Sequence, residues 1–204
     1  MTDTLMVGVS GVRGIVGKDL TADVVTQWAR GFGLWLREGT SAGGPGPGTA
    51  AVIGRDARTS GPMFAAAVTA GLTSVGCDVI DIGLVPTPTV QLAVEHHRAG
   101  GGIAITASHN PIEWNALKFI GPDGIFLDGT DGARMAQLAA GPAESGKRET
   151  LKDTPRVAGH VTADSDAVER HLASVLRLPA VDVSAIRARQ FTVGSLSKIG
   201  RAHV

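Results

Sequence analysis

A serine on a predicted turn, followed by a lysine, stands in the stretch 102–120, where the residue types could support group-transfer chemistry. A short β-branched run predicts a buried strand that ends just before Ser108. Asn110 and Pro111 close the turn, because Asn tolerates tight local hydrogen bonding and Pro disfavours a helical residue before it. Lys118 lies in a second apolar run, where a cation costs desolvation energy unless an anion awaits it. The stretch predicts a nucleophile on a turn, followed by a strand that carries a cation.

The chemistry at Ser108 depends on what surrounds its hydroxyl group. A serine needs a base to act as a transient nucleophile, or it carries a transferred group as a modification. His109 is adjacent, but neighbouring side chains at a strand end diverge, and the G-x-S-x-G motif of hydrolases is missing around Ser108. A phosphoserine needs cations and donors nearby, and Arg13, Lys118 and His109 are candidates. These residues favour a phosphoryl carrier; a serine hydrolase and a non-catalytic phosphate-binding module remain alternatives.

Arg13 lies in a short glycine-flanked loop, residues 10–14, that follows an apolar run. Glycines let the backbone pass close to a ligand while the guanidinium reaches it, which predicts a phosphate contact. A surface turn with a solvated arginine is the competing interpretation.

Strand and helix patterns alternate along the first 140 residues, which predicts an α/β fold. The sheet is expected to be mostly parallel, with helices on both faces and functional sites at the carboxyl ends of the strands. Arg13, Arg55, Thr87 and Ser108 should then lie along one edge of the sheet. Three charged residues after the second strand, Arg55, Asp56 and Arg58, are expected to pair mainly with one another. Strands are expected at 50–54, 77–82 and 103–106, and helices at 21–37, 62–75, 89–98 and 131–140.

The pattern changes after residue 145, which predicts a second domain. Residues 1–145 are expected to form the first domain, and 156–197 an incomplete start of a second α/β unit with a strand at 191–193. Residues 198–204 differ abruptly from what precedes them, and we expect a non-native tail on a truncated gene product.

Composition excludes several classes of function. Nineteen basic residues balance nineteen acidic ones, so no global charge favours nucleic acid or an anionic membrane. No apolar run approaches the roughly 18 residues of a membrane span, and a cytoplasmic protein is expected. The single cysteine, Cys77, excludes an internal disulfide and should fill a core position. Adjacent His96 and His97 cannot chelate one metal from the same helix and are expected to be solvated.

The turn sequence T-A-S-H-N-P, residues 106–111, resembles the phosphoserine loop of the α-D-phosphohexomutases, the superfamily of phosphoglucomutase, phosphomannomutase and phosphoglucosamine mutase. Four further segments, 10–14, 54–56, 86–88 and 115–119, resemble segments of that family in the same order. The resemblance implies a three-layer α/β/α first domain with a mostly parallel mixed sheet and the start of a second, similar domain.

The resemblance also implies a reaction. Phosphorylated Ser108 would donate its phosphoryl group to a hexose monophosphate, and the bisphosphorylated sugar would return the other phosphate, exchanging phosphate between C1 and C6. Lys118 and Arg13 match positions used for proton transfer and charge stabilisation, and His109 matches a hydrogen-bonding histidine. Ser10, Asn110 and Thr87, with Arg13, would contact substrate or phosphate.

The implied cofactor is Mg²⁺, and only the Ser108 phosphate can be carried over as its ligand. The family's D-G-D-G-D-R-type metal loop does not occur in these 204 residues, so the polypeptide alone is expected to lack appreciable mutase activity. The segments G-V-R-G-I-V-G and W-N-A-L-K-F-I favour phosphoglucosamine mutase, with phosphomannomutase and phosphoglucomutase as alternatives. The oligomeric state and the hexose stay open.

Overall fold

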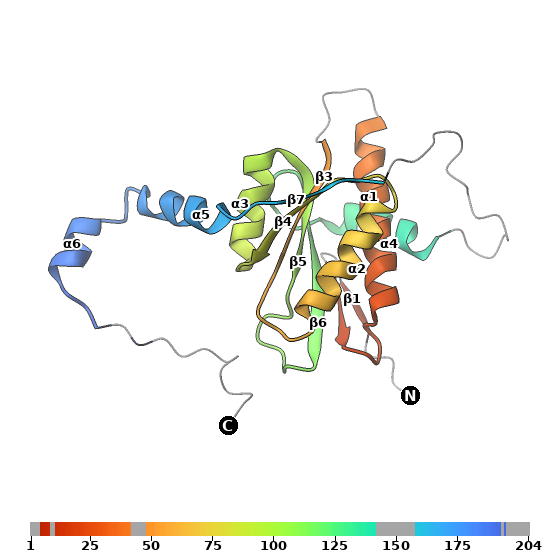
Figure 1. The fold of residues 1–204 in the computed structure, drawn as a ribbon, viewed down its shortest axis with the longest axis horizontal. Helices are drawn as coiled ribbons and strands as arrows, with labels where there is room; N and C mark the ends of the chain where they lie inside the picture. Colours follow the sequence, from red (N-terminus) through yellow and green to blue (C-terminus); the bar gives the residue numbers. More distant parts are fainter. Residues whose placement is uncertain (1–4, 9–10, 42–47, 142–157, 193, 195–204) are drawn as a thin grey trace.

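One mixed sheet forms the centre of the molecule, as the computed structural model shows for residues 5–8, 11–41, 48–141, 158–192 and 194 (Figure 1). Across the sheet the strands are β1 (Met6–Gly8), β2 (Gly11–Ile15), β6 (Trp114–Ile120), β5 (Ala99–Ile105), β3 (Gly48–Arg55), β4 (Val79–Leu84) and β7 (Val161–Ala163). Two antiparallel pairings, β5 with β6 and β6 with β2, place β2 in the same direction as β5. β3, β4 and β7 are parallel to β5, so β1 and β6 alone run the opposite way among the described strands.

Helices cover both faces of the sheet. Successive residues of a strand point to opposite sides, so each face has its own buried cluster. Val52 and Ile53 are neighbours on β3, yet each belongs to a different buried apolar cluster. The Ile53 cluster includes residues of α1 (Ala22–Ser41), α2 (Gly61–Thr73) and α4 (Gly129–Ala140). The Val52 cluster includes residues of α3 (Thr87–His97) and the first residue of α5 (Ala167–Leu176). The predicted three-layer α/β/α fold with a mostly parallel mixed sheet is confirmed.

Local signals explain where the first helix begins. The Thr21 hydroxyl accepts a hydrogen bond from the Val24 N–H at 3.3 Å, as expected of an N-cap residue. The buried residues of α1 include Val25, Ala29, Phe32 and Leu36, which recur at helical spacing toward the sheet. Cys77 is also buried, as predicted, and its thiol donates to the Gly33 carbonyl oxygen at 3.3 Å.

The chain after residue 157 returns to the same sheet. β7 pairs in parallel with β4, and α5 lies beside α3, while α6 (Val183–Ala188) lies away from the sheet (Figure 1). The strand predicted at 191–193 is wrong for Phe191 and Thr192, which lie outside any strand, and Phe191 is 66% exposed. Val193, the segment 142–157 and the predicted tail 198–204 lie outside the described residues.

His97 corrects another expectation. Its Nε2 lies 2.7 Å from Asp164 Oδ2, so it contacts the β7–α5 connection instead of being solvated, while His96 is exposed. Within the described part of the chain, no helix combines the length and the apolar character that crossing a bilayer would require.

Candidate active site

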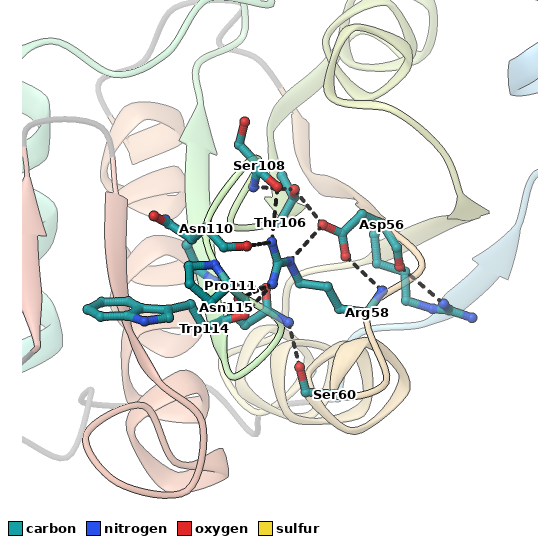
Figure 2. A network of polar contacts seen from close by, with 11 residues as sticks. Asp56, Arg58, Ser60, Thr106, Ser108, Asn110, Pro111, Trp114 and Asn115 are labelled. Carbon is teal, nitrogen blue, oxygen red and sulfur yellow. Dashed lines mark hydrogen bonds and ion pairs between the residues drawn. The ribbon is translucent and has the colours of Figure 1, made fainter. Parts of the chain in front are cut away.

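Ser108 lies on a tight turn directly after β5. The Asn110 N–H donates to the Ala107 carbonyl at 3.1 Å and closes the turn. Ser108 has a φ of 53°, a left-handed conformation that non-glycine residues rarely adopt. Its side chain is exposed, and its hydroxyl points away from the Arg58 guanidinium (Figure 2). The predicted nucleophile is therefore presented to solvent on a sharply defined backbone.

Both backbone groups of Ser108 are held by buried side chains. Its N–H donates to Thr106 Oγ1 at 3.1 Å, and its carbonyl accepts from Arg58 Nη2 at 3.0 Å. The Thr106 hydroxyl in turn donates to Asp56 Oδ2 at 2.6 Å. The turn is thus connected on both sides to the loop that follows β3 (Figure 2).

Arg58 is the centre of this polar network, although it was expected only to pair with its neighbours. The predicted pairing exists, since Arg58 Nε lies 3.2 Å from Asp56 Oδ2. Arg55 makes a longer contact, 3.5 Å from Nη1 to the Asp56 carbonyl. Arg58 is only 5% exposed and also donates to the backbone of the Ser108 turn, which the sequence analysis did not predict. The available signal was a charged cluster, R-D-A-R, directly after a buried strand.

A second buried polar contact ties β6 to the start of α2. Asn115 is fully buried, and its Nδ2 donates to Ser60 Oγ at 2.9 Å. Ser60 occupies the N-cap position of α2 without a side-chain capping bond of its own. This contact fixes the first residues of β6, which lead from the Ser108 turn to Lys118.

Lys118 and Arg13 line the same cavity, of about 260 Å³, over strands β1, β2 and β6. Arg13 pairs with Ala116 across β2 and β6, and Gly11 pairs with Lys118, so both cations lie on one face of the sheet. Arg13 Nε donates to Met6 Sδ at 3.3 Å. Lys118 Nζ lies 5.7 Å from the centroid of the Phe126 ring. The sequence-predicted cations are brought together.

The backbones of β2 and β6 pack closely where they line this cavity. A Cβ atom on Gly11 would lie 2.2 Å from the Leu117 carbonyl oxygen, so a side chain there would force β2 and β6 apart. Ala116 lines the cavity, and its carbonyl accepts the Thr106 N–H at 3.0 Å. The pairing of β5 with β6 therefore connects the Ser108 turn, which follows Thr106, to a residue that lines the cavity.

The structure describes three of the four remaining predicted site residues. His109 is exposed and Asn110 is half-buried, and both belong to the Ser108 turn. Thr87 is the half-buried first residue of α3, after β4. Ser10 lies outside the described residues.

The described residues do not form a metal site by themselves. No group of three His, Cys, Asp or Glu side chains within them could hold an ion. Asp56 is linked to the Ser108 turn, but its carboxylate already accepts from Arg58 and Thr106. The residues present therefore do not fit a protein-ligated Mg²⁺.

Known proteins share this fold. Residues 4–143 match the family model described as phosphoglucomutase/phosphomannomutase, alpha/beta/alpha domain I. A phosphoglucomutase/phosphomannomutase of Thermococcus kodakarensis is 45% identical over 121 residues, which are 59% of this chain and 25% of that protein. A phosphoglucosamine mutase of Rhodococcus erythropolis is 38% identical over 182 residues, which are 88% of this chain and 39% of that protein.

A solved structure of a phosphoglucomutase/phosphomannomutase family protein from Burkholderia thailandensis superposes with a TM-score of 0.61 and 28% identity. The superposition covers 79% of this chain and 33% of the Burkholderia chain. The chain thus spans between a quarter and two fifths of the lengths of these two curated relatives. Because the family model matches well over half of the residues, the chain belongs to the phosphoglucomutase/phosphomannomutase family and contains its α/β/α domain I.

Proposed function

We propose that this chain supplies the phosphoserine domain of a hexose-phosphate mutase. The observation that carries the proposal is the Ser108 turn: an exposed hydroxyl on a backbone held from both sides, at the end of β5, whose partner strand β6 helps to line the cavity that contains Arg13 and Lys118. Phosphoryl transfer depends mainly on positioning and on neutralising charge, and this arrangement supplies both. The family membership supports the same reaction class.

In the proposed reaction, the phosphoryl group on Ser108 Oγ is transferred to a hydroxyl oxygen of a hexose monophosphate. The P–O bond to serine breaks as the new P–O bond forms, and the serine oxygen keeps the electron pair and takes up the proton that the sugar hydroxyl releases. Arg13 and Lys118 stabilise negative charge on the sugar phosphate from the cavity that they line. His109 and Asn110 follow Ser108 in the turn and can donate hydrogen bonds to its phosphoryl group.

The finer assignments are also proposals. We favour glucosamine phosphate as substrate because the Rhodococcus relative is a phosphoglucosamine mutase that aligns over most of this chain. Mannose and glucose phosphates remain alternatives, given the Thermococcus relative. Mg²⁺ is the proposed cofactor, and the described residues would contribute to it only through a phosphate on Ser108. The cytoplasmic location and the absence of nucleic-acid and membrane partners stay predictions.

The test is the phosphorylation state of Ser108 in the full-length product of the gene. After incubation with hexose 1,6-bisphosphate, intact-mass and peptide spectra should find one phosphoryl group on Ser108. Ser108→Ala should abolish both the phosphate and mutase activity, whereas Ser74→Ala, which alters an exposed serine at the end of α2, should leave both unchanged. Labelling of Ser108 by an organophosphonate without phosphate transfer would favour a serine hydrolase instead. Binding of sugar phosphate without turnover would favour a non-catalytic module.

A related expectation concerns the 204-residue polypeptide by itself. It contains no D-G-D-G-D-R-type loop, and its described residues contain no metal cluster. We expect no appreciable conversion of glucosamine 6-phosphate or mannose 6-phosphate in a coupled assay. Efficient conversion by the purified chain would show that the first domain needs no downstream metal loop.

A further inference from the structure

The backbone at Ser108 has a conformation that its own residue type disfavours. The turn 107–110 has a positive φ at its second residue, Ser108, while His109 does not have a positive φ. A positive φ at this position favours glycine over a residue that carries a side chain. An L-residue in a left-handed conformation costs about 1–2 kcal/mol, so surrounding contacts must hold it there.

Arg58 makes the largest set of these contacts. Its Nη2 donates to the carbonyls of Ser108 at 3.0 Å and Asn110 at 2.8 Å. Its Nη1 donates to the carbonyls of Pro111 at 2.7 Å and Trp114 at 2.9 Å. Arg58 therefore gathers four carbonyl groups of the turn and of the start of β6 around one planar cation.

The guanidinium uses its full donor capacity in doing so. A guanidinium has five N–H groups, and the fifth, on Nε, donates to Asp56 Oδ2 at 3.2 Å. Because every donor has a protein acceptor and the residue is 5% exposed, Arg58 is not available to bind a substrate phosphate. A lysine offers three donors from a single point and cannot reproduce this planar set.

The opposite side of Ser108 is held through the same carboxylate. Asp56 Oδ2 accepts from Thr106 Oγ1 at 2.6 Å, and Thr106 Oγ1 accepts the Ser108 N–H at 3.1 Å. The Ser108 N–H and carbonyl are thus both fixed, and with them the two peptide planes that define its φ and ψ (Figure 2). This double restraint aims the hydroxyl outward, away from the guanidinium.

We propose that Arg58 is a positioning residue for phosphoryl transfer: its five hydrogen bonds hold Ser108 in the left-handed conformation that directs its oxygen toward the substrate. The part of this inference that concerns transfer rests on the proposed function. The part that concerns conformation does not, so the two can be tested separately.

The test replaces Arg58 by lysine, which keeps the charge but loses the planar set of donors. Arg37→Lys is the matched control, because Arg37 also donates to a backbone carbonyl, that of Val75 at 3.1 Å, but on α1 and remote in sequence from the Ser108 turn. NMR couplings and backbone chemical shifts of Ser108 in the 204-residue chain report its φ. Steady-state kinetics of the full-length gene product report transfer.

We expect Arg58→Lys to abolish the positive-φ signature of Ser108 and to lower kcat about 100-fold with little change in KM, the effect of a misplaced reacting group. Arg37→Lys should preserve both. A folded Arg58→Lys chain that keeps the Ser108 signature, or an undiminished kcat, would overturn the proposal. If the wild-type product shows no mutase activity, the proposed function fails while the Ser108 conformation still tests Arg58.

A measurement on the unaltered chain covers the case in which Arg58→Lys does not fold. Five separate, slowly exchanging guanidinium N–H signals are expected for Arg58, because each hydrogen has its own acceptor. Averaged, rapidly exchanging signals would contradict the proposed restraint.

Discussion

At position 108, the residue type that the proposed chemistry needs differs from the type that the backbone conformation favours. The proposed transfer needs a hydroxyl group there, whereas a φ of 53° favours glycine. The hydrogen bonds from Arg58 and to Thr106 hold the serine in place despite this cost. Strain of this kind is common where a residue is held ready for reaction.

This conflict predicts an unusual order of stability among variants that lack the hydroxyl. Ser108→Gly should be more stable than Ser108→Ala by up to about 1 kcal/mol, because the relief of left-handed strain exceeds the entropy cost of glycine. Urea unfolding followed by tryptophan fluorescence measures the difference. At Ser74, where φ is −62°, the order should reverse, with alanine more stable than glycine. Equal stability of the two Ser108 variants would argue that the turn is not left-handed.

Residue types made Ser108, Arg13 and Lys118 visible in the sequence, because a nucleophile and nearby cations suggest chemistry without any coordinates. The loop expected at residues 10–14 was wrong for Arg13, which lies in the middle of β2. Arg58 was not predicted as part of the site. Its role depends on four carbonyl groups that converge only when the turn and the start of β6 are folded. No pattern of residue types records the direction of a carbonyl group.

Among the helices, α1 packs closely against two neighbours where glycines remove side chains. A Cβ atom on Gly31 would lie 2.6 Å from the backbone nitrogen of Ala139 in α4. A Cβ atom on Gly71 of α2 would lie 2.6 Å from the Thr26 carbonyl oxygen of α1. The helix layer that supports β2 and β6 therefore depends on close helix contacts.

Gly31→Ala should destabilise the fold by about 1–3 kcal/mol, because overpacking must separate α1 from α4. Gly39→Ala is the matched control, since Gly39 is an exposed residue of the same helix with open space around its Cβ position. This control should be neutral or more stable by about 0.5–1 kcal/mol, the helix preference of alanine over glycine. Free energies of unfolding from urea titrations distinguish the two, and similar values for both would contradict the close packing.

Element prediction succeeded where periodicity was long and failed where segments were short. Helices α1 to α4 and the central strands were predicted from apolar spacing, with ends displaced by a few residues. β7 was not predicted, because its three residues are all exposed and carry no buried pattern. It exists through backbone pairing with β4, whereas Phe191 and Thr192 do not pair as a strand.

At the scale of the whole molecule, the segment after residue 157 is attached to the sheet through both backbone and charge. Asp164 follows β7 and contacts His97 of α3 at 2.7 Å, and it also pairs with Arg170 of α5. Nearby, Thr89 Oγ1 lies 2.8 Å from His171 Nδ1. These contacts connect α5 to α3 while several apolar residues of α5, including Leu172 and Leu176, remain exposed.

This attachment should weaken in acid. Burial alone would raise the pKa of Asp164, but hydrogen bonds from Arg170, His97 and the Asp166 backbone outweigh it and lower the pKa to about 2. A carboxylate with a lowered pKa in the folded state adds stability above its unfolded pKa of about 4, and this stability is lost as pH falls toward 2. We expect the amide signals of Val161, Thr162 and Ala163 to shift over that range before those of β5 change.

Asp164→Asn provides the comparison, because it keeps the side-chain shape and removes the titrating group. It should weaken the attachment at neutral pH and remove the acid dependence between about pH 4 and pH 2. Simultaneous loss of the β7 and β5 signals in the unaltered chain would instead indicate global acid unfolding. An unchanged titration in Asp164→Asn would assign the acid sensitivity to another carboxylate. We expect the β7 signals to change before those of β5 because β7 lies at the edge of the sheet, where it pairs only with β4 among the described strands.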